Sequence, residues 1–129
     1  MDKDLKSRPL VWMGLVLILV IYLTNPSLAI AHDPKEVKLE MDAGMQNVVV
    51  TITHKSPFPN WHYIKLVQIS KNGGIVSTNE YKNQPVKETF EYTYPVAVIA
   101  GDVIEVTVSC SITGSKSAKL IINPSSKTP

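Results

Sequence analysis

The sequence predicts an all-β domain, an Ig-like antiparallel β-sandwich of about seven strands, preceded by an N-terminal signal peptide or anchor helix. Apolar residues from Glu36 onward recur with a period of two, as on strands that bury one face. Turn-forming residues such as Asn72-Gly73-Gly74 separate the alternating runs. Several short alternating runs in a chain of 129 residues are typical of an Ig-like sandwich.

The alternation sets both the expected strands and the face of each strand that is buried. The expected strands cover residues 36–41, 46–54, 62–70, 75–82, 87–94, 102–111 and 116–123. Side chains two apart on a strand share a face, so His54 continues the apolar row that ends at Ile52, and Cys110 continues the row that ends at Val108. Both side chains are therefore expected at a rim of the core.

The segment before these strands has the features of a targeting signal. Residues 10–23 carry no charge, and Ala29-Ile30-Ala31 supplies the small-x-small pattern that a signal peptidase accepts. Residues 1–31 are therefore predicted to be a signal peptide. A retained membrane anchor through residues 10–23 is the alternative, although a spanning helix needs ~20 apolar residues.

Under either interpretation of the leader, the residues after Ala31 are predicted to be exported to a periplasmic or extracellular location. The exported part is predicted to be one sandwich domain over residues 32–123, followed by a short disordered tail over residues 124–129. The membrane is then a partner only through an uncleaved N-terminal segment.

Charge and cysteine content exclude several classes of function. The chain has 13 basic and 11 acidic residues, a net charge of +2, and no block of basic residues, so nucleic acid is not an expected partner. Its single cysteine, Cys110, excludes an intramolecular disulfide, a Cys-x-x-Cys motif and a four-cysteine metal site.

Three histidines and the cysteine form a candidate metal site. His62 is expected to begin the third strand, and His32 lies shortly before the first, so both can meet His54 and Cys110 at one rim. A thiolate combined with imidazoles suits iron, copper or zinc. The predicted metal ligands are His32, His54, His62 and Cys110. The alternative for Cys110 is a small core hydrophobe.

The order of these residues is similar to that in a known family. His32-Asp33-Pro34, then His62-Tyr63-Ile64 and finally Cys110 before Gly114 resemble the ferrous-iron domain of desulfoferrodoxin and superoxide reductase, over about residues 32–122. The resemblance implies an Ig-like sandwich that holds one Fe²⁺ ion through histidines and a cysteine, with one open position for superoxide. It also implies an external electron donor, since the chain has no four-cysteine module.

The sequence departs from the family pattern at several positions, and the family's acidic residue just before the His-x-Pro motif has no equivalent in Ile30-Ala31. Ser56 stands where the family has its second histidine, which leaves His54 as the substitute. Thr113 replaces the last histidine, and Trp61 replaces the catalytic lysine. The residues that remain therefore indicate a metal site related to that of the family, whereas the lost histidine and lysine argue against superoxide reductase activity. No catalytic residue is assigned.

Three readings of function remain open. The first is a mononuclear iron-binding domain similar to superoxide reductase. The second is a copper-binding or electron-transfer module, in which cleavage after Ala31 would give His32 a free α-amine that also binds the metal. The third is a non-catalytic Ig-like partner-binding domain that has lost the metal. A homodimer is compatible with each.

Overall fold

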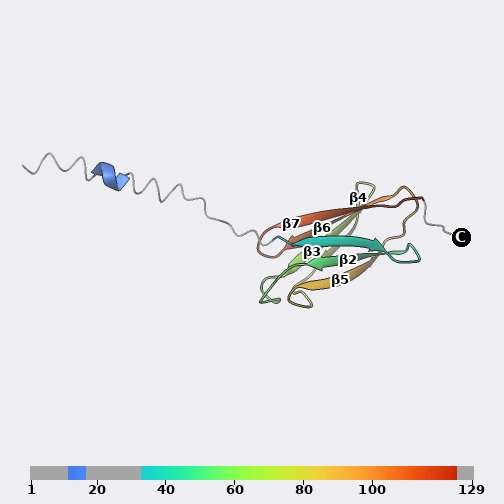
Figure 1. Ribbon diagram of the computed structural model, residues 1–129, viewed down its shortest axis with the longest axis horizontal. Helices are drawn as coiled ribbons and strands as arrows, with labels where there is room; N and C mark the ends of the chain where they lie inside the picture. Colours follow the sequence, from blue (N-terminus) through green and yellow to red (C-terminus); the bar gives the residue numbers. More distant parts are fainter. Residues whose placement is uncertain (1–11, 17–32, 125–129) are drawn as a thin grey trace, which may run out of the picture. The chain divides into compact units, whose positions relative to one another are not determined.

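The computed structural model describes residues 12–16 and 33–124. Residues 12–16 form one short helix, and all seven strands lie in residues 36–121 (Figure 1). The strands are β1 (Glu36–Met41), β2 (Asn47–Thr53), β3 (Ile64–Lys71), β4 (Gly74–Glu80), β5 (Thr89–Pro95), β6 (Val103–Cys110) and β7 (Ser115–Ile121). Each expected strand is present, with ends displaced by no more than two residues.

The strands form two antiparallel sheets. One sheet has the order β1-β2-β5, and the other has the order β4-β3-β6-β7. Figure 1 shows these sheets as two layers, with the β2–β3 connection passing from one layer to the other. The predicted β-sandwich of about seven strands is confirmed.

The core lies between the inward faces of the two sheets. Along β2 and β6 every second residue is fully buried, as the period of two requires. These fully buried residues are Val48, Val50 and Ile52 of β2 and Ile104, Val106 and Val108 of β6. The next residue in each row is His54 or Cys110, so both apolar rows end in a metal-ligand type of side chain at the same end of the sandwich.

That end of the sandwich is called the ligand rim below. It contains the β2–β3 loop (residues 54–63), the β6–β7 turn (residues 111–114) and the chain segment that enters β1. These segments lie at the same end of the sandwich because the antiparallel strands β2 and β6 end there, while β1, β3 and β7 begin there. Three segments far apart in sequence thus converge there.

The predicted leader lies mostly outside the described residues. The structure does not describe residues 1–11 and 17–31 of this leader, His32, or residues 125–129 of the expected tail. Within residues 12–16 and 33–124, no helix is long and apolar enough to cross a membrane.

Asp102 supports the opposite rim through a network of donors. Its carboxylate accepts hydrogen bonds from Asn72 Nδ2 (2.8 Å) and the Ile99 amide (3.0 Å), and Lys71 Nζ lies 3.1 Å away. The Asn72 bond is the largest cause that lowers the pKa of Asp102 to about 2, followed by the Ile99 amide and then by Lys71.

Asp102→Asn is expected to make folding less sensitive to acid. A carboxyl group whose pKa is lower in the folded state than in the unfolded state stabilises the fold above the unfolded value, 3.8, and this stabilisation is lost as the pH falls toward 2. The urea midpoint of the natural chain should exceed that of the variant at pH 7, and the difference should shrink between pH 4 and pH 2. A difference that stays constant over this range would contradict the expectation.

Candidate metal centre

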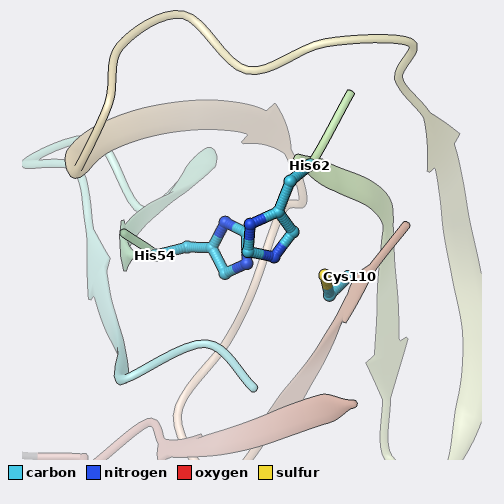
Figure 2. A group of neighbouring side chains, drawn as sticks. All are labelled: His54, His62 and Cys110. Carbon is cyan, nitrogen blue, oxygen red and sulfur yellow. The ribbon is translucent and has the colours of Figure 1, made fainter. Parts of the chain in front are cut away.

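His54, His62 and Cys110 form a buried cluster at the ligand rim. One potential ligand atom from each residue lies within 4.8 Å of the others. The exposed fractions are 1% for His54, 6% for His62 and 2% for Cys110. The two imidazole rings approach edge to face, with centroids 4.5 Å apart, and Figure 2 shows both rings and the Cys110 sulfur gathered around one small region. Three of the four predicted ligands therefore lie together, and His32 lies outside the described residues.

Strand parity explains the position of two of these ligands. His54 follows the last residue of β2, on the buried face that contains Ile52, and Cys110 is the last residue of β6, on the buried face that contains Val108. His62 differs slightly from its expected place, because it lies in the β2–β3 loop and not in β3, which begins at Ile64. A turn in this loop orients it: the Phe58 carbonyl accepts bonds from the amides of Trp61 and His62, each at 2.9 Å.

Ser56 has a structural role in the same loop. It is fully buried, and its hydroxyl donates a hydrogen bond to the carbonyl of His62. The position at which the family resemblance places a histidine therefore fastens the loop, and the imidazole that joins the cluster comes from His54, two residues earlier. Trp61, at the position of the family's lysine, is 72% exposed.

The β6–β7 turn holds Cys110 by its backbone. The Cys110 amide donates to the Gly114 carbonyl at 2.9 Å, and the Ile112 amide lies 3.4 Å from Cys110 Sγ, where it can donate to the sulfur. The thiolate is the form of a cysteine that binds metals. Thr113 lies in this turn, and Gly114 has a φ of +90°, a conformation that suits glycine.

Gln84 is an additional residue of the cluster that the sequence analysis did not identify. It is 3% exposed, and its side-chain oxygen lies 2.7 Å from His54 Nδ1. Its side-chain nitrogen donates to the carbonyls of His54 (2.9 Å) and Val86 (2.8 Å). Gln84 belongs to an irregular segment between β4 and β5, so no periodicity in the sequence could have shown which way its side chain points.

The cluster has the properties of a metal site in its donors and in their burial. His54 Nε2 is buried and has no hydrogen-bond partner among the described residues, although an unsatisfied buried polar atom is costly. A bound metal ion would satisfy it. Bonds of ~2.0–2.1 Å to nitrogen and ~2.3 Å to sulfur place neighbouring ligand atoms ~3.3–3.6 Å apart around a tetrahedral ion, so atoms at the 4.8 Å limit would need to approach one another by roughly 1 Å.

Comparisons with known proteins give a distant structural likeness. Neither the family models nor the curated proteins match the chain. Two similar solved structures are variants of superoxide reductase (neelaredoxin) from Ignicoccus hospitalis. One is 17% identical, with a TM-score of 0.45 over 75% of this chain and 83% of that chain. The other is 15% identical, with a TM-score of 0.45 over 76% and 86%.

Proposed function

We propose that this protein binds one redox-active transition-metal ion at the ligand rim through His54, His62 and Cys110, with Fe²⁺ as the favoured ion. The observation that carries this proposal is the convergence of two imidazoles and one thiol, all buried, within 4.8 Å. Nitrogen and sulfur donors of this kind select borderline-soft metals, such as iron, copper and zinc, over magnesium or calcium. The preference for iron comes from the His-x-Pro, His-Tyr-Ile and cysteine pattern of the sequence.

Each protein group has a definable task in such a site. Cys110 would bind as a thiolate and supply the negative charge, while the Ile112 amide stabilises that charge. His54 and His62 would bind as neutral imidazoles, and their burial limits the access of water to the ligand atoms. Iron bound here would supply one-electron chemistry. The electron would come from an external donor, because a sequence with Cys110 as its only cysteine has no four-cysteine iron module to supply it.

His32 is proposed as a further ligand on the basis of its neighbour in the chain. A Cβ atom placed on Gly114 would lie 3.0 Å from the Cα of Asp33, so Asp33 packs directly on the turn that follows Cys110. His32 precedes Asp33 by one peptide bond. If residues 1–31 are removed as a signal peptide, as proposed for an exported protein, His32 would also offer a terminal amine to the ion.

Copper is the second candidate because of the donor set itself. Two histidines and one cysteine are the strong ligands of blue-copper electron-transfer sites, which also occur with a weak axial ligand. The three clustered residues supply this set without any contribution from His32. An electron-transfer module would then be the function, and an intense visible thiolate-to-copper absorption band would distinguish it from the iron site.

Metal titration of the full chain tests the proposal. Apo-protein is titrated with Co²⁺ as a redox-inert probe, with Fe²⁺ without oxygen, and with Cu²⁺, while absorption and Trp61 fluorescence are recorded in a Trp12→Phe background that leaves one tryptophan. Because Trp61 adjoins His62 in sequence, a bound paramagnetic ion should quench it. Saturation at one equivalent, with a thiolate charge-transfer band, is expected. If none of the three ions shows saturable binding, the proposed metal site is wrong and the protein is better explained as a partner-binding domain without a metal.

A further inference from the structure

We infer that Gln84 is a positioning residue that holds His54 as the Nδ1–H tautomer, so that Nε2 is the atom presented to the metal. The role of this tautomer in metal binding rests on the proposed function. The tautomer itself follows from hydrogen bonds that involve no metal.

The orientation of the Gln84 amide is set by its two carbonyl partners. One end of the amide lies 2.9 Å from the His54 carbonyl oxygen and 2.8 Å from the Val86 carbonyl oxygen. Carbonyl oxygens only accept hydrogen bonds, so this end must be the NH₂ group, which has two protons for two acceptors. A flipped amide would place three oxygens together with no proton between them. The other end, which faces His54, is therefore the oxygen.

The orientation of the amide in turn sets the proton on His54. The Gln84 oxygen accepts but cannot donate, and it lies 2.7 Å from His54 Nδ1. Nδ1 must therefore carry the proton of that bond. In a neutral imidazole the lone pair is then on Nε2, which is buried at the cluster and has no hydrogen-bond partner among the described residues. His54 thus presents the basic nitrogen that a metal ion requires.

Gln84 also limits how far the His54 ring can rotate. The amide bridges the His54 backbone and side chain, so the ring and its own carbonyl are held by one buried group. The same amide binds Val86 and connects the segment between β4 and β5 to the end of β2. A histidine ligand that is fixed in tautomer and orientation binds metal more tightly, and loss of such a partner commonly costs roughly 10- to 100-fold in affinity.

The test begins with the metal-free full chain. Long-range ¹H–¹⁵N correlation spectra of histidine at neutral pH identify which ring nitrogen of His54 is protonated, and Nδ1–H is expected. Gln84→Met, which keeps the approximate size and removes both polar groups, should shift His54 toward the Nε2–H tautomer and weaken Co²⁺ binding roughly 10- to 100-fold. Asn83→Ala, an exposed neighbour in the same segment, serves as the control and should change neither quantity.

The possible results separate the inference from the proposed function. Protonation at Nε2 in the natural chain, or an unchanged tautomer in Gln84→Met, would overturn the inference whatever the metal does. Protonation at Nδ1 together with no Co²⁺ binding would support the tautomer assignment and overturn the proposed metal site. The spectrum of the natural chain decides the tautomer even if Gln84→Met does not fold.

Discussion

Replacing Cys110 with serine is expected to weaken the binding of Co²⁺ and Fe²⁺ on the order of 100-fold or more and to abolish the thiolate charge-transfer band. The thiolate is the only anionic donor in the cluster of His54, His62 and Cys110, and a serine hydroxyl stays protonated and binds borderline-soft metals weakly. Loss of a ligand should exceed the 10- to 100-fold effect typical of its hydrogen-bonding partners. Competition with a chelator of known affinity would measure the change.

Val108→Ala provides the matched control for this variant. Val108 is fully buried, two residues before Cys110 on the same face of β6. Its truncation should cost about 2 kcal/mol of unfolding free energy through the lost burial and the cavity, while the metal affinity is retained. Cys110→Ser should show the opposite pattern, with metal affinity lost and a smaller change in the stability of the metal-free protein. Equal metal affinity in Cys110→Ser and the natural chain would show that Cys110 is a plain core residue.

Replacing Gly114 with alanine is expected to be the most destabilising change at any turn discussed above, by about 3 kcal/mol. Part of the cost is the left-handed backbone, because φ is +90° and an L-residue is strained there by ~1–2 kcal/mol. The remainder comes from overpacking: the new Cβ would overlap the Asp33 carboxylate and lie 3.0 Å from the Asp33 Cα. The chain segment before β1 would have to move away from the turn. Urea unfolding of the metal-free protein would measure the loss.

Gly73→Ala separates these two contributions. Gly73 has a similar φ of +85°, but an added Cβ there would meet no atom within 4 Å. It should lose only ~1–2 kcal/mol, the backbone cost. If His32 is a ligand, Gly114→Ala should also weaken Co²⁺ binding while Gly73→Ala leaves it unchanged. Equal stability losses in the two variants would show that Asp33 does not press on the turn in solution.

The period-two pattern predicted the strands well because a strand that buries one face has apolar residues at every second position of its sequence. Each expected strand is present, and parity correctly placed His54 and Cys110 at the ends of buried rows. This information is local: once a strand is recognised, the face of every residue on it follows. The sequence could therefore indicate that these two side chains point into the core and end near a rim.

Residues in irregular segments could not be placed in this way. Ser56, Gln84 and Gly114 have no periodic neighbours that would fix their direction. The structure shows Ser56 fastening the β2–β3 loop, Gln84 bonded to His54, and Gly114 against Asp33. These contacts depend on how three loops from two sheets meet.

The sequence by itself determined the sandwich and the chemical character of the candidate ligands, because alternation and residue type are properties of the chain. The tertiary structure decided that His54 joins His62 and Cys110 in one buried cluster, and that an amide 30 residues along the chain binds the His54 ring. The physical reason is that distance and hydrogen-bond direction between segments far apart in sequence are set by the packing of the two sheets.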